Sequence, residues 1–163
     1  LATPSREAVK IAHPDPAMPE IRYAETEQDM VAMHEFFLVV AQPAMQCKVN
    51  VVKSLQEIIR VTREEVALML VREGRLIGTM GIINPVWWYG DDGFLTDRWH
   101  FVLPEFDHTV DSALLLSEAV KVADAAGLKF YHQGRIRQGK NGVMRLMPRV
   151  YGGESATVEP QGV

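Results

Sequence analysis

His100 and Asp97 are two side chains near the middle of the chain that could transfer protons. An imidazole has a pKa of about 6.5 without tuning, so His100 can act as a general base near neutral pH. Asp97 would need burial to raise its carboxyl pKa toward that range. Both residues fall in a predicted strand, 95–103, and side-chain alternation along a regular strand places them on opposite faces. We therefore expect that they do not work as a pair inside one pocket.

The residues that follow this strand could bind an anion. Pro104 and Glu105 end the strand, and a helix with strong apolar periodicity is predicted over 109–126. The free N–H groups and the dipole at a helix start favour an anionic ligand. Asp107 and Asp111 lie at this start, and unpaired carboxylates there would repel a phosphate group.

Composition excludes several classes of protein and partner. The chain has 163 residues, 47% of them apolar, with a net charge of −4, which fits one globular domain. It has no apolar run of about 18 residues and no basic excess, so neither a membrane nor a nucleic acid is an expected partner. The single cysteine, Cys47, and five histidines without metal-ligand spacing predict neither a disulfide nor a metal site. A reducing compartment, the cytoplasm, is the expected location.

The elements that must position these residues alternate in type. Thr26 and Asp29 form a helix-start signal. Helices are predicted over 27–41, 51–63, 109–126 and 138–149, and strands over 21–24, 66–71, 76–83, 95–103, 128–133 and 155–159. This order places antiparallel strands in the middle, followed by one βαβ crossover. We interpret residues 1–20 as a flexible N-terminal arm and 21–163 as the folded domain.

This order and two local motifs resemble the GNAT family of N-acetyltransferases, over roughly residues 21–158. The segment from Phe101 to Phe106 (FVLPEF), followed by a helix, is similar to the end of the family's fourth strand. Asn141 and Gly152 match two positions of the family's C-terminal motif. The resemblance implies an α+β fold with a mixed, mostly antiparallel central sheet and helices on both faces. It also implies that the sheet opens between 95–103 and 128–133.

The resemblance further implies an acetyl-CoA-dependent N-acetyltransferase, in which an amine attacks the thioester directly. The acceptor would be an amine of a small molecule or of a protein. Three residues are candidates for catalysis: Asp97, His100 and Tyr131. The candidates for binding acetyl-CoA are Phe101, Val102, Leu103, His108, Thr109, Val110, Asp111, Ser112 and Asn141.

The chain also departs from the family pattern. Phe106, Thr109 and Asp111 stand where the phosphate-binding motif has Gln or Arg, Gly, and Gly or Ala, and Asp107 replaces a residue that is often basic. The threonine is similar to a variant found in members from tailed phages. Pro148 stands where a tyrosine often protonates the departing thiolate. These departures support an alternative, a GNAT-fold structural or partner-binding protein that has lost acetyl-CoA binding.

Two further segments leave alternatives open. The aromatic residues Trp87, Trp88 and Tyr89 lie in a loop rich in Pro, Gly and Asp. They could pack on the core, line an acceptor pocket, or form a contact with a second copy or another protein. The basic segment 129–140 could offset acidic surface or bind the phosphates of CoA.

Overall fold

The computed structural model describes residues 18–41, 47–86, 89–107, 109–133, 137–138, 144–145, 149–152 and 157–158. Seven of its strands form one sheet in the order β1-β2-β3-β4-β5-β8-β9, and two more, β6 and β7, form a separate pair. The strands are β1 (Glu20–Tyr23), β2 (Val66–Arg72), β3 (Arg75–Ile83), β4 (Phe94–Val102), β5 (Lys129–His132), β6 (Arg137–Gln138), β7 (Met144–Arg145), β8 (Arg149–Tyr151) and β9 (Thr157–Val158). Every pairing is antiparallel except the parallel one between β4 and β5.

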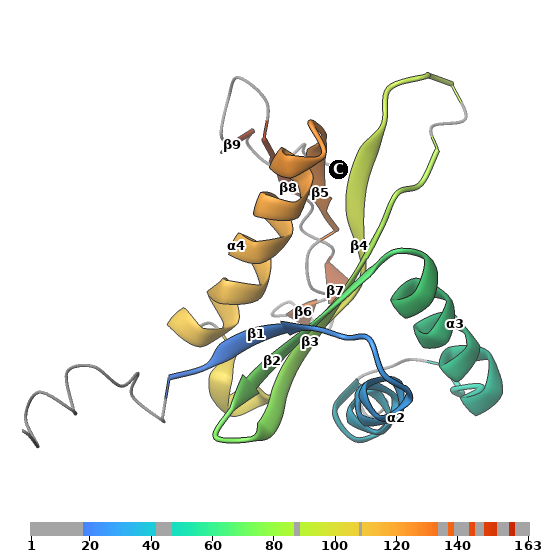
Figure 1. Ribbon diagram of the computed structural model, residues 1–163, viewed down its shortest axis with the longest axis vertical. Helices are drawn as coiled ribbons and strands as arrows, with labels where there is room; N and C mark the ends of the chain where they lie inside the picture. Colours follow the sequence, from blue (N-terminus) through green and yellow to red (C-terminus); the bar gives the residue numbers. More distant parts are fainter. Residues whose placement is uncertain are drawn as a thin grey trace, which may run out of the picture.

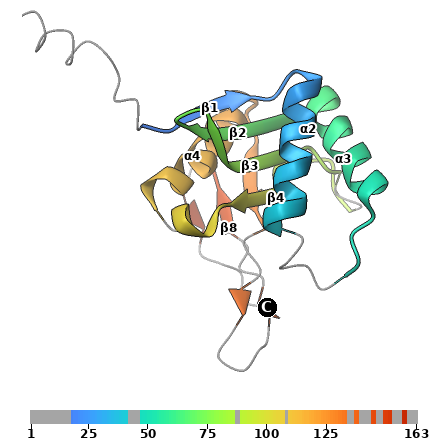
Figure 2. The ribbon, with the colours of Figure 1, turned by 90° about the horizontal axis from the view of Figure 1, so that it is seen from below.

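Helices cover both faces of the large sheet (Figures 1 and 2). They are α2 (Glu27–Phe36), α3 (Val51–Glu64) and α4 (Val110–Ala125). Helices α2 and α3 lie on one face and α4 lies on the other. This arrangement confirms the expected α+β fold class. No helix within the described ranges is long and apolar enough to cross a membrane.

Local sequence signals account for the helix boundaries. Thr26 and Asp29 form the expected capping box at the start of α2. Asn50 caps α3 by accepting a hydrogen bond from the backbone N–H of Lys53 at 2.9 Å. Gly127 follows α4 with a φ of +69°, a conformation that glycine adopts without steric cost. The expected starts and ends of these helices therefore agree with the structure, except where α2 changes to a π-helical turn at Phe37–Ala41.

Two apolar cores hold the helices against the sheet. The core on the α4 face includes the fully buried side chains of Met80, Leu115 and Phe130. The core on the other face includes Met33 of α2 and Ile58 of α3, together with other buried residues of α2 and β2. Strand β4 therefore has one face toward α4 and the other toward α2 and α3.

The C-terminal region differs from expectation. The helix predicted over 138–149 is wrong, because its described residues lie in β6, β7 and β8. β8 pairs with β5 in the register Tyr131↔Val150, and pairing with a distant strand overrides weak local helix signals. The predicted last strand is present as β9. The predicted N-terminal arm lies outside the described residues except for 18–20.

Candidate active site

The parallel pairing between β4 and β5 ends early. It comprises Phe94↔Lys129, Leu95↔Phe130 and Thr96↔Tyr131, after which β4 continues to Val102 paired with β3. Two side chains of β4 bridge the point of divergence. The Thr96 hydroxyl donates to the Tyr131 carbonyl at 2.6 Å, and the Asp97 carboxylate accepts from the Gln133 N–H at 2.7 Å. The sheet therefore opens between β4 and β5, as expected.

A β-bulge in β4 changes which side chains share a face. Asp97 pairs with Ile82 and Trp99 pairs with Gly81, so Arg98 is the extra residue. The inserted residue shifts the alternation by one, and Asp97 and His100 then lie on the same face of the strand. The expectation that these two residues lie on opposite faces is therefore wrong.

Asp97 and His100 are linked through His132 of β5. The Nε2 atom of His132 lies 3.0 Å from Nδ1 of His100 and 3.9 Å from Oδ2 of Asp97. Because one of the two hydrogen-bonded imidazole nitrogens must donate and the other must accept, they share one proton between them. Burial raises the pKa of the Asp97 carboxyl, while His132 and the Gln133 N–H act against this rise. The two imidazoles can share a proton, whereas Asp97 acts on His132 through its charge, because 3.9 Å is too long for a hydrogen bond.

Sequence reasoning missed His132. Its role depends on the bulge at Arg98 and on the register between β4 and β5, neither of which has a local sequence signal. Its place on β5 two residues after the buried Phe130 indicates that it faces α4. That periodicity is the only signal that could have found it.

Replacing Asp97 with Asn is expected to stabilise the protein relative to the wild type, and to do so more as the pH rises. The folded state raises the pKa of Asp97 above its ordinary value of 3.8, so the wild type loses stability as the pH rises from that value through the raised one. Asn has no such titration and can still accept from the Gln133 N–H. Chemical denaturation at several pH values between about 4 and 7 checks this expectation. A difference between the two proteins that is independent of pH would contradict it.

Two of the carboxylates near the start of α4 are paired with arginines, which offset their negative charge. The Asp111 carboxylate is paired with the Arg72 guanidinium of β2 at 2.6 Å, and Glu105 is paired with Arg75 at 3.3 Å. The Thr109 hydroxyl caps the helix by accepting from the Ser112 N–H. Because Arg72 offsets the charge of Asp111, the repulsion of a phosphate expected from that carboxylate is reduced.

Of the other predicted site residues, Val102 and Leu103 pack in the core on the α4 face, and Val110 is exposed in the first turn of α4. Tyr131 packs edge-on against Phe94, with ring centroids 5.2 Å apart, and strand alternation puts it on the face opposite His132. The structure therefore does not group Tyr131 with the Asp97–His132–His100 chain. His108 and Asn141 lie outside the described residues. So do the two tryptophans of the aromatic loop, whereas Tyr89 is 66% exposed.

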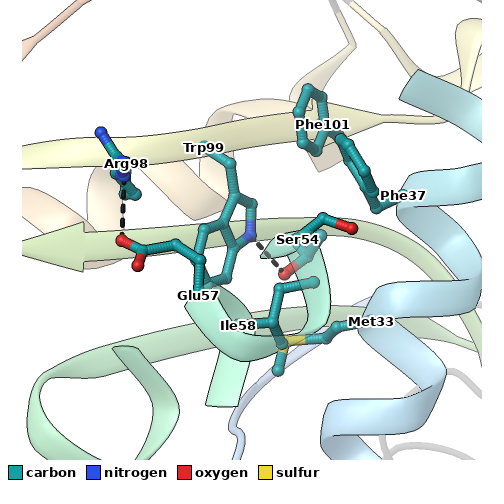
Figure 3. Close-up of a pocket in the computed structure, with 9 residues that line it drawn as sticks. Met33, Phe37, Ser54, Glu57, Ile58, Arg98, Trp99 and Phe101 are labelled. Carbon is teal, nitrogen blue, oxygen red and sulfur yellow. Dashed lines mark hydrogen bonds and ion pairs between the residues drawn. The ribbon is translucent and has the colours of Figure 1, made fainter. Parts of the chain in front are cut away.

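A cavity of about 250 Å³ lies on the other face of β4, between the sheet and helices α2 and α3 (Figure 3). It is lined by Met33, Phe37, Ser54, Glu57, Ile58, Thr79, Arg98, Trp99 and Phe101. Three irregular features border it. The π-helical turn begins at Phe37, the bulge places Arg98 at its wall, and Gly81 leaves room for the Trp99 ring. Such irregularities occur often at functional sites, which makes this cavity a second candidate for a ligand site.

Comparisons with known proteins agree with the fold. A GNAT-family acetyltransferase from Brucella melitensis, solved in complex with acetyl-CoA, is similar with a TM-score of 0.60 and 14% identity, covering 89% of this chain and 94% of that chain. An aminoglycoside 6′-N-acetyltransferase from Acinetobacter baumannii has a TM-score of 0.58 and 14% identity, covering 72% and 80%. A GNAT-family acetyltransferase from Staphylococcus aureus has a TM-score of 0.55 and 12% identity, covering 88% and 98%. No protein-family model and no curated protein matches the sequence. The chain therefore has the GNAT fold.

Proposed function

We propose that this protein is an acetyl-CoA-dependent N-acetyltransferase that transfers an acetyl group to an amine. The observation that carries the proposal is the opening between β4 and β5, with the start of α4 following the end of β4. An extended ligand with amide groups can pair with the edge of β4 beyond Thr96. The first-turn N–H groups of α4 can bind a phosphate. These two features fit the pantetheine and the pyrophosphate of acetyl-CoA.

Residues of β4 and β5 can take defined roles in this reaction. Acetyl-CoA supplies an activated acyl group, and the protein has to hold it beside the amine and remove a proton. The backbone of Phe101, Val102 and Leu103 would position the thioester arm. His100 would accept the proton of the attacking amine, with His132 and Asp97 stabilising the charge that develops on the imidazole.

The alternative is a protein that keeps the fold and lacks acetyl-CoA binding. The observation in its favour is Asp111 itself, a carboxylate in the first turn of α4 whose charge needs Arg72 as a partner. The two functions differ in one measurable property, the affinity for acetyl-CoA. The Arg72–Asp111 pair offers a way to test where that ligand binds.

Replacing Arg72 with Met is expected to weaken acetyl-CoA binding by about tenfold or more. The unpaired Asp111 carboxylate would then face the pyrophosphate, and a like charge at ~4–6 Å costs on the order of 1–4 kcal/mol. The double variant Arg72→Met with Asp111→Asn should recover most of the affinity, because it removes both charges. Isothermal titration with acetyl-CoA measures all three proteins, and thermal unfolding confirms that each is folded. Equal affinity in all three would contradict binding at the start of α4.

A further inference from the structure

The cavity beside α2 and α3 has the size of one compact apolar group. Its volume is about 250 Å³, whereas a dry apolar cavity of ~150 Å³ is large enough to hold benzene. Its inner walls are the side chains of Met33, Phe37, Ile58, Trp99 and Phe101 (Figure 3). A single substituted ring or a branched alkyl group therefore fits it.

The hydroxyl groups of the cavity wall are already hydrogen-bonded to other groups of the protein. The Ser54 hydroxyl donates to the Val51 carbonyl at 3.0 Å and is hydrogen-bonded to Nε2 of His34 at 2.9 Å. The Thr79 hydroxyl donates to the Leu68 carbonyl at 2.9 Å and accepts from the Trp99 indole N–H at 3.1 Å. Since both hydroxyl protons are used, neither group is left to donate to a polyhydroxylated ligand.

The charged residues of the lining do not favour a polycation either. Glu57 is its single carboxylate, and this group already accepts from Arg60 at 2.8 Å and from Arg98 at 3.0 Å. Arg98 is 53% exposed, so this ion pair, drawn as a dashed line in Figure 3, lies where the cavity meets solvent. A ligand that enters the cavity therefore meets a carboxylate whose charge is offset by arginines at the opening, and apolar side chains inside.

The cavity and the proton-accepting chain are joined through β4. Trp99 and Phe101 line the cavity, and His100 lies between them in sequence with its side chain toward the opposite face. This part of β4 lies beyond its last pair with β5. A group held in the cavity therefore lies beside this unpaired part of β4, and an amine on its tether would have to extend past the open edge of the strand to meet His100 on the other face.

We propose that this cavity binds the side group of the acceptor, and that the acceptor is a primary amine bearing one compact apolar group, such as an aromatic ring, on a short tether. This inference rests on the proposed acetyltransferase function and names its substrate class. It distinguishes this chain from its structural neighbours that are named aminoglycoside acetyltransferases. Polar, polycationic acceptors are disfavoured, because the two hydroxyl protons and the Glu57 carboxylate already have partners within the protein.

The test compares 2-phenylethylamine with ethylamine and kanamycin. Binding is measured by isothermal titration without acetyl-CoA, and transfer is measured as CoA thiol release with acetyl-CoA. We expect 2-phenylethylamine to bind, and to exceed ethylamine in kcat/KM by at least tenfold, with no transfer to kanamycin. Ile58→Phe, which fills the cavity, should weaken ring binding at least tenfold. Val52→Phe adds the same ring at an exposed position of the same helix and should change nothing.

A second variant protects the test against a folding defect. Phe101→Ala enlarges the cavity and should improve the binding of the two-ring amine 2-(1-naphthyl)ethylamine relative to 2-phenylethylamine. Equal use of ethylamine and 2-phenylethylamine by a protein that binds acetyl-CoA would overturn the acceptor class and leave the transferase function intact. Ring binding without any acetyl-CoA binding would overturn the transferase function, and with it the acceptor role.

Discussion

The variant His100→Gln is expected to lose on the order of 10²–10⁴-fold in kcat while binding acetyl-CoA as tightly as the wild type. Gln can keep a hydrogen bond to His132 but cannot accept a proton from the attacking amine. The wild-type kcat/KM should fall on the acid side as the His100 imidazole becomes protonated, and the variant should lack this acid limb. Steady-state kinetics between about pH 5.5 and 9 measure both quantities.

The variant His132→Phe tests whether His132 acts through its ring nitrogens or only by filling space beside His100. Phe fills the space of the imidazole but has no nitrogen to hold 3.0 Å from His100. We expect a smaller loss in kcat, about tenfold, together with a displaced acid limb, because the charge on His100 would lose its connection to Asp97. A fall in rate with an unchanged pH profile would assign His132 a structural role only.

Gly81→Ala is expected to reduce the free energy of unfolding by about 1–3 kcal/mol and to abolish binding of an apolar ring in the cavity. A Cβ at this position would lie 2.5 Å from the Cε3 and Cζ3 atoms of the Trp99 ring. The ring is held by its N–H donated to Thr79, so it can yield only by moving into the cavity and straining that bond. Chemical denaturation and titration with 2-phenylethylamine measure the two effects.

Gly74→Ala is the matched control for this substitution. Its Cβ would meet no atom within 4 Å, and the cost comes only from a φ of +75°, about 1–2 kcal/mol. It should therefore destabilise the protein to a similar extent without affecting ring binding. Adding Trp99→Phe to Gly81→Ala should restore part of the stability, because the clashing ring atoms are removed. Strictly additive effects of the two substitutions would show that Gly81 is not required by Trp99.

The sequence predicted most of the fold, because its signals are local. The capping box at Thr26, the apolar periodicity of α4 and the short apolar strands each specify their own element. Their order then left few possible topologies. The region from 138 to 149 was predicted incorrectly because its strands are defined by pairing with β5 and with each other.

The candidate site was only partly predictable, because its key features depend on distant residues. The bulge at Arg98 reverses the face of His100 relative to Asp97, and no residue in 95–103 marks it. The pairing of Arg72 with Asp111 joins residues 39 positions apart in sequence, so the sequence overstated the repulsion at the start of α4. The cavity combines side chains from two helices and two strands, and no one of these segments indicates it alone.

The most direct test of the central claim is a thermal-shift titration of the wild-type protein with acetyl-CoA and with CoA. A ligand at 100 times its Kd adds ~2.7 kcal/mol of stability, which raises the Tm of a domain of this size by roughly 5–10 °C. We expect a saturable shift of this size with both ligands, since the phosphates and pantetheine are common to them. The absence of any shift up to millimolar acetyl-CoA would contradict the proposed function and favour a GNAT-fold protein that acts without this ligand.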